Sequence, residues 1–99
     1  MSYAIVLRPR AERAIEKAAG WYRKDSAGIA STFLRAVDHT IERVAENPYQ
    51  FPVRSGQLRH AMVTGFPYSL LYLVAESSVV VTNCVHFRRH PPLAIATDR

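Results

Sequence analysis

Apolar residues recur with two different periods along the chain, and these periods divide it into helical and extended segments. Residues 3–7 are apolar and β-branched, which predicts a short strand. Apolar residues at three- and four-residue spacing then predict an amphipathic helix over about 9–24, with Pro9 in its first turn. A turn at 25–28 separates it from a second stripe of the same kind, which ends near Asn47 before a proline. We therefore expect two antiparallel helices packed side by side.

The second half of the chain has the pattern of a sheet. Residues 48–56, with two prolines and a glycine, predict a loop. Three apolar runs, at 58–64, 68–75 and 79–87, predict strands joined by connections of hairpin length. From about residue 88 the chain contains two adjacent prolines, and we expect an irregular tail.

The element order is β-α-α-β-β-β, in a chain of 99 residues that is long enough for one domain. This order predicts a two-layer α+β fold, in which an antiparallel sheet carries a helical hairpin on one face. We assign residues 1–99 to a single domain.

The strand at 68–75 predicts a partner, because both of its faces are largely apolar. Tyr68, Leu70 and Tyr72 share one face, whereas Leu71 and Leu73 lie on the other. The helices can cover only one face of the sheet, and an exposed face usually alternates to polar residues. A second apolar face therefore indicates association with another polypeptide.

Composition and charge add to this expectation. The net charge is +5, a moderate basic bias that suits nucleic acid or an acidic partner. Residues 1–50 nearly balance eight Lys/Arg against six Asp/Glu, whereas residues 54–90 hold four arginines and three histidines against the single acid Glu76. We therefore expect the functional surface in the C-terminal half.

Several classes of protein are disfavoured. No apolar run approaches the roughly 20 residues of a membrane span, and the N-terminus lacks the pattern of a signal peptide. The one cysteine, Cys84, cannot form an internal disulfide, which suits a reducing cytoplasm. The histidines lack metal-ligand spacing, so we expect no metal site and no cofactor.

The ordered set of short motifs resembles the RelE/ParE superfamily of type II toxin–antitoxin toxins, and within it the ParE-like, plasmid-stabilisation branch. The resemblance runs from about Tyr3 to Pro92. Its motifs are residues 8–12 after the first strand, the pair Trp21-Tyr22, residues 41–48, the pair Phe51-Pro52, residues 66–72 and residues 85–91.

The resemblance implies the same β-α-α-β-β-β fold and a cytoplasmic toxin. It also implies a neighbouring antitoxin whose extended C-terminal part wraps the toxin, with operator DNA bound only through that antitoxin and no membrane partner. For the antitoxin surface we name three residues of the strand at 68–75 and two helical aromatics, although such aromatics usually pack in cores. These residues are Tyr68, Leu70, Tyr72, Trp21 and Tyr22.

Two activities are known in the superfamily. ParE-like members inhibit DNA gyrase by protein–protein contact, whereas RelE-like members cleave mRNA on the ribosome with arginines, lysines and a late tyrosine. Here Ser69 stands where RelE-like enzymes have a functional arginine, Arg88 matches a second arginine, and no tyrosine follows Tyr72. The resemblance therefore favours a non-enzymatic gyrase inhibitor.

The candidate residues for the two activities overlap. For target binding we name the basic end of the last strand, with two residues expected to lie beside it: Arg88, Arg89, His90, Arg59 and His60. If the chain were a ribonuclease, the acid–base set would be Arg88, His86 and Arg59. A third hypothesis is a member that has lost toxicity and only binds its antitoxin, which Ser69 supports.

Overall fold

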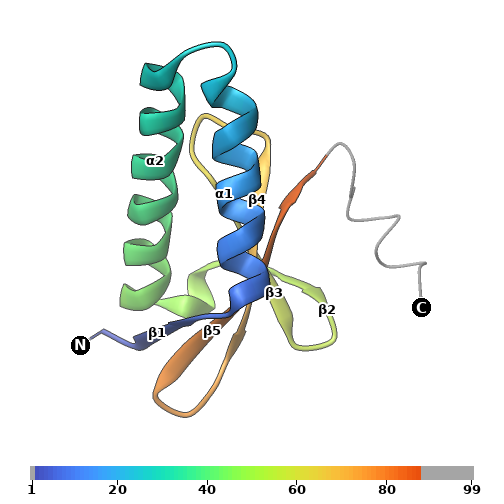
Figure 1. Ribbon diagram of the computed structural model, residues 1–99. Helices are drawn as coiled ribbons and strands as arrows, with labels where there is room; N and C mark the ends of the chain where they lie inside the picture. The colour runs from blue at the N-terminus through green and yellow to red at the C-terminus, as the bar shows by residue number, and fades with distance from the viewer. Residues whose placement is uncertain (1, 88–99) are drawn as a thin grey trace.

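Two helices cover one face of a five-stranded sheet (Figure 1). The computed structural model describes residues 2–87. The helices are α1 (Pro9–Arg23) and α2 (Ala27–Glu46), followed by the short 3₁₀ helix η1 (Pro48–Gln50). The strands are β1 (Ala4–Leu7), β2 (Val53–Ser55), β3 (Leu58–Met62), β4 (Tyr68–Val74) and β5 (Ser78–His86). The expected two-layer α+β fold is confirmed.

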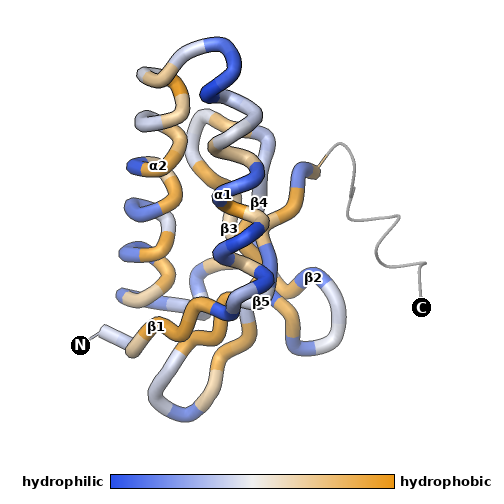
Figure 2. Tube along the Cα trace, viewed as in Figure 1, coloured by the Kyte–Doolittle hydropathy of each residue, from blue (hydrophilic) through white to orange (hydrophobic). Residues whose placement is uncertain are grey.

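The helix boundaries follow from local chemistry. Pro9 opens α1 after the extended residue Arg8, where the missing proline N–H costs no helical hydrogen bond. Ser26 caps α2, and its hydroxyl oxygen accepts hydrogen bonds from the backbone N–H groups of Gly28 (3.1 Å) and Ile29 (3.2 Å). The hydrophobic side of α2 is turned toward α1, and the hydrophilic side lies away from it (Figure 2).

The core lies between the helices and the sheet, and aromatic rings dominate one end of it. Tyr22, Phe33, Phe66 and Tyr68 form a cluster whose ring centroids lie 5.1–6.2 Å apart. On α1 the buried positions are mostly alanines, which allow the helix to approach the sheet closely. These alanines are Ala11, Ala18 and Ala19.

The sheet is mixed, with strand order β1-β5-β4-β3-β2. Strands β2 to β5 pair antiparallel as expected, but β1 pairs parallel with β5, with Ile5 opposite Val79. Parallel neighbours need a long crossover connection, and here the helical layer and strands β2 to β4 lie between β1 and β5 in the chain. This parallel edge was not expected from the sequence.

The predicted loop at 48–56 contains regular structure. It holds η1 and the three-residue strand β2, in which Val53 pairs with Arg59 and Ser55 with Leu58. The turn between β2 and β3 uses Gly56 with φ of 57°, a conformation that favours glycine. A three-residue strand is too short to show a period in the sequence.

Among residues 2–87, no helix is both long and apolar enough to cross a membrane. Within that same part of the chain, no three His, Cys, Asp or Glu side chains come together as metal ligands would.

Candidate functional site

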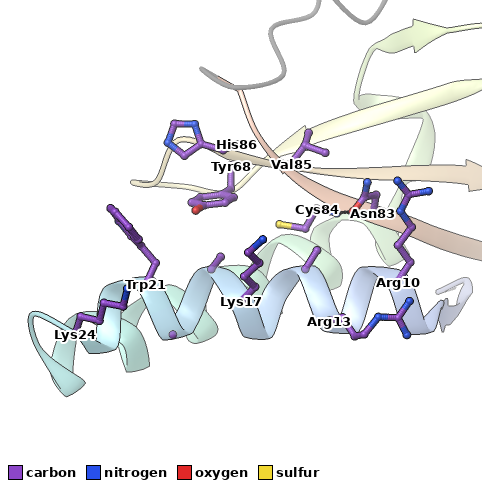
Figure 3. Close-up of a pocket in the computed structure, with 13 residues that line it drawn as sticks. Arg10, Arg13, Lys17, Trp21, Lys24, Tyr68, Asn83, Cys84, Val85 and His86 are labelled. Carbon is purple, nitrogen blue, oxygen red and sulfur yellow. Dashed lines mark hydrogen bonds between the residues drawn. The ribbon is translucent and has the colours of Figure 1, made fainter.

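A groove of about 700 Å³ lies between α1 and the C-terminal half of β5, open on one side of the molecule (Figure 3). Its walls are one face of α1, the end of β5 and the start of β4. The lining residues of α1 are Arg10, Arg13, Ala14, Lys17, Ala18, Gly20, Trp21 and Lys24. Those of the strands are Tyr68, Asn83, Cys84, Val85 and His86.

The α1 wall is a stripe of cations. Arg10, Arg13, Lys17 and Lys24 recur at spacings of three, four and seven residues, which places them on one side of a helix. Lys17 and Trp21 extend from the helix toward the strands (Figure 3). No acidic residue lines the groove among residues 2–87, so the charged side chains that line it are all basic.

Trp21 stands on the cationic wall as its largest apolar side chain. It is 60% exposed, and the ammonium of Lys24 lies 5.3 Å from its ring centroid. An exposed tryptophan beside cations is unusual on a free surface and common at the centre of protein–protein contacts.

The floor of the groove is formed by side chains of β4 and β5 that pack against one another. The His86 ring lies edge-on to the Tyr68 ring, with centroids 5.0 Å apart, and Tyr68 joins the aromatic cluster of the core. Cys84 is 6% exposed, and burial raises the pKa of its thiol to about 12. The Asn83 side chain accepts a 2.8 Å hydrogen bond from the Cys84 backbone N–H.

The side chains of this groove suit binding of a charged segment better than nucleophilic chemistry. The Cys84 thiol stays protonated at neutral pH and is a poor nucleophile. Four cations around an apolar floor are complementary to a segment that carries carboxylates on its flanks and apolar side chains on one face.

The structure divides the five residues predicted to bind an antitoxin. Trp21 is exposed on the groove wall, and Tyr68, although 4% exposed, forms part of its floor. Tyr22 is half-buried in the aromatic cluster. The prediction for Leu70 and Tyr72 is wrong, because these side chains are 1% and 0% exposed on the sheet face that packs against the helices.

The opposite face of the sheet is less exposed than its sequence pattern suggested. Leu73 and Met62 are exposed, at 36% and 46%, whereas Ser69 and Leu71 are buried. The Ser69 hydroxyl donates a 3.2 Å hydrogen bond to the Met62 sulfur. The apolar surface available to a partner on this face consists of Met62 and Leu73 together with Val6, which is 46% exposed and, like Leu73, lies opposite Val80 in the sheet.

Of the five predicted target-binding residues, only Arg59 and His60 lie within the described part of the chain. Arg88, Arg89 and His90 lie outside the described residues. The expectation that Arg59 and His60 adjoin the end of β5 is wrong, because His60 pairs with Leu71, and Leu71 pairs with Asn83. His60 therefore lies two strands away from β5 and roughly 10 Å short of His86 along it.

Arg59 and His60 have structural surroundings of their own. The Arg59 guanidinium donates a 2.6 Å hydrogen bond to the Phe51 carbonyl and lies 5.0 Å from the Tyr49 ring centroid. Burial, and then the charge of Arg54, lower the pKa of His60 below its ordinary value.

The cationic wall was not expected from the sequence, because the charges of residues 1–50 nearly balance and the functional surface was expected in the C-terminal half. The residues concerned are Arg10, Arg13, Lys17 and Lys24. Their spacing of three, four and seven residues could have predicted the wall, because it places four basic residues and Trp21 on one side of the helix. Basic residues around an exposed aromatic residue indicate a binding surface more strongly than scattered charges do.

Comparisons with known proteins identify a family and a shared fold. Residues 5–91 match the family model described as ParE toxin of type II toxin–antitoxin system, parDE. A solved structure, the chromosomal ParDE TA system from P. aeruginosa, superposes with a TM-score of 0.75 at 10% sequence identity. The superposition covers 86% of this chain and 96% of that chain. No curated protein matches the sequence.

Proposed function

This chain belongs to the ParE toxin family of type II toxin–antitoxin systems, and from that premise we propose that it inhibits DNA gyrase by protein–protein contact until an antitoxin neutralises it. The family implies a cognate antitoxin, encoded beside the toxin.

The basic groove supports the proposal that an antitoxin binds between α1 and β5. It offers Arg10, Arg13, Lys17 and Lys24 above an apolar floor, with Trp21 exposed at its rim. An acidic amphipathic segment would place carboxylates against these cations and bury apolar side chains on Tyr68 and Cys84. Such a segment would also remove the exposed Trp21 from water, which favours binding by burial of apolar area.

The positions of the alternative catalytic residues support gyrase over mRNA as the target. Arg59 pairs with Tyr72, which pairs with Val81, so Arg59 lies five residues short of His86 along the sheet. This separation, roughly 17 Å, is too large for two groups that must act on one phosphate. Ser69, at the position of a RelE-like arginine, is buried beneath Met62.

A supercoiling assay tests the target. Purified toxin added to gyrase, ATP and relaxed plasmid should inhibit supercoiling and leave cleaved DNA, and a stoichiometric amount of antitoxin should restore activity. An in vitro translation reaction with the same toxin preparation provides the comparison. Unaffected gyrase together with cleaved mRNA would replace this proposal with the ribosomal one, and inertness in both assays would favour a member that only binds its antitoxin.

A further inference from the structure

A second surface, which shares no lining residue with the basic groove, carries two guanidinium groups fixed on aromatic rings. It is formed by the end of α2, the segment from η1 to β2, and β3. Its cavity has a volume of about 390 Å³. The lining residues are Arg43, Phe51, Pro52, His60, Met62, Val63, Thr64, Gly65 and Phe66.

Phe51 connects the two arginines. The Arg43 guanidinium carbon lies 5.2 Å from the Phe51 ring centroid, and Arg59 donates its 2.6 Å hydrogen bond to the Phe51 carbonyl. Arg59 is further held over Tyr49, and Tyr49 lies edge-on to Tyr3, with ring centroids 6.5 Å apart. Both guanidinium groups are therefore positioned before any partner arrives, which reduces the entropy lost on binding.

The backbone below these side chains is fixed as well. The Gln50 amide donates hydrogen bonds to the carbonyls of Arg43 (2.9 Å) and Asn47 (3.0 Å), and Asn47 caps η1 through the Tyr49 N–H at 3.1 Å. The segment that carries Tyr49 and Phe51 is thus tied to the last turn of α2.

The composition of this surface is that of a protein-binding site. Tyr49, Val53 and Met62 are exposed, at 56%, 49% and 46%. Arginine, tyrosine and methionine are enriched at interfaces, and no acidic residue of the described chain lines the cavity. The surface therefore suits a partner that presents carboxylates beside an apolar side chain.

The edge of β3 next to this cavity is also open. Strand β2 pairs only with Leu58 and Arg59, and the His60 N–H bonds to the Pro52 carbonyl at 3.1 Å. Met62 lies two residues further on, so its backbone groups point to the same edge. Within residues 2–87, no strand pairs with this edge at Met62. An extended segment could add there by backbone hydrogen bonds.

We propose that this surface, defined by Arg43, Tyr49, Phe51, Arg59 and Met62, is where the toxin binds an acidic, extended segment of its target protein. The proposal rests on the function proposed above, to which it adds a target-binding surface separate from the antitoxin groove. Nucleic acid suits the surface less well, because the arginines already cover the Phe51 and Tyr49 rings on which bases would stack.

Charge reversal on the full-length toxin tests the surface. Arg43→Glu and Met62→Glu place a like charge opposite an acidic segment, and Arg35→Glu makes the same change at an exposed site elsewhere on α2. Each variant is purified through its antitoxin complex, and antitoxin affinity within about twofold of the parent's shows that the fold and the groove are intact. Growth after induction without antitoxin is then measured, together with binding to purified gyrase.

We expect Arg43→Glu and Met62→Glu to raise viable counts at least tenfold over the parent and to weaken gyrase binding at least tenfold, with Arg35→Glu as toxic as the parent. Full toxicity in either surface variant that retains antitoxin affinity overturns the surface. If both variants lose toxicity but the parent never binds gyrase, the surface stands and the gyrase target fails. A parent chain that leaves growth unchanged overturns both proposals.

Discussion

The hydroxyl of Tyr72 donates a buried 2.6 Å hydrogen bond to the backbone carbonyl of Pro48, joining the middle of the sheet to the segment that follows α2. Tyr72 is 0% exposed, and burial raises its pKa to about 12 against the opposing charge of Arg59, so the hydroxyl remains a donor at neutral pH. Through Pro48 this one bond fixes the start of η1, and with it the position of Tyr49 and Phe51 on the proposed target surface.

Tyr72→Phe should therefore lower the free energy of unfolding by about 1–3 kcal/mol, because the Pro48 carbonyl loses its partner in a buried site. Urea denaturation measures the change. Tyr49→Phe, which removes a hydroxyl from a side chain that is 56% exposed, is the matched control and should stay within about 0.5 kcal/mol of the parent. Equal stability of the two variants would contradict the role assigned to the bond.

Gly20→Ala should stabilise the toxin. Gly20 lies inside α1, its φ is not positive, and an added Cβ would meet no atom within 4 Å. Alanine restricts the unfolded chain and favours the helix, so the free energy of unfolding should rise by about 0.5–1 kcal/mol. Thermal denaturation followed by circular dichroism measures it, and a lowered melting temperature would show that the site is more crowded than the structure indicates.

Trp21→Ala should weaken antitoxin binding while leaving the toxin folded. The side chain is 60% exposed on the groove wall, so its loss removes little from the core, whereas a tryptophan at the centre of an interface commonly contributes at least about 2 kcal/mol. Titration calorimetry with the antitoxin should show an affinity reduced at least tenfold. Ile29→Ala, at an exposed apolar residue outside the groove, is the control and should bind as the parent does.

The Cys84 thiol should react slowly in the folded protein. Its pKa is raised to about 12 by burial, so the thiolate that attacks a disulfide reagent is scarce at pH 8. Ellman's reagent should label the native toxin at least a hundredfold more slowly than the same toxin in 8 M urea, where the thiol has its ordinary pKa (about 8.5) and full access. Immediate stoichiometric labelling of native protein would contradict the burial of this side chain.

The toxin should be less stable in mild acid, because the folded state disfavours protonation of His60. Burial and the charge of Arg54 hold its folded pKa below the ordinary 6.5, so the unfolded chain takes up the proton more readily. Above pH 6.5 His60 is neutral in both states and does not lower the free energy of unfolding. As the pH falls from 6.5 toward the folded pKa, the unfolded chain binds the proton first, and the free energy of unfolding decreases. Urea denaturation between pH 7.5 and 5 should show a smaller loss in His60→Gln than in the parent.

Local periodicity in the sequence was enough to predict most of the elements. The helical stripes located α1 and α2 to within about two residues, because a helix is specified by neighbours three and four positions apart. The strands β3, β4 and β5 were located within two residues for the same kind of reason. Strand β2 was missed because three residues carry no period, and the parallel pairing of β1 with β5 was missed because no local pattern specifies a partner so distant in sequence.

The functional surfaces depended on relationships that only the tertiary structure decided. Alternation along β4 showed that Tyr68, Leu70 and Tyr72 share a face, but the packing of the helices decided that this face is the core. The register of β3, β4 and β5 separated Arg59 from His86. Because α1 packs beside β5, Lys17 and Trp21 form one wall of a groove. Periodicity is a property of neighbouring residues, whereas register and layer packing are set by contacts between segments far apart in the chain.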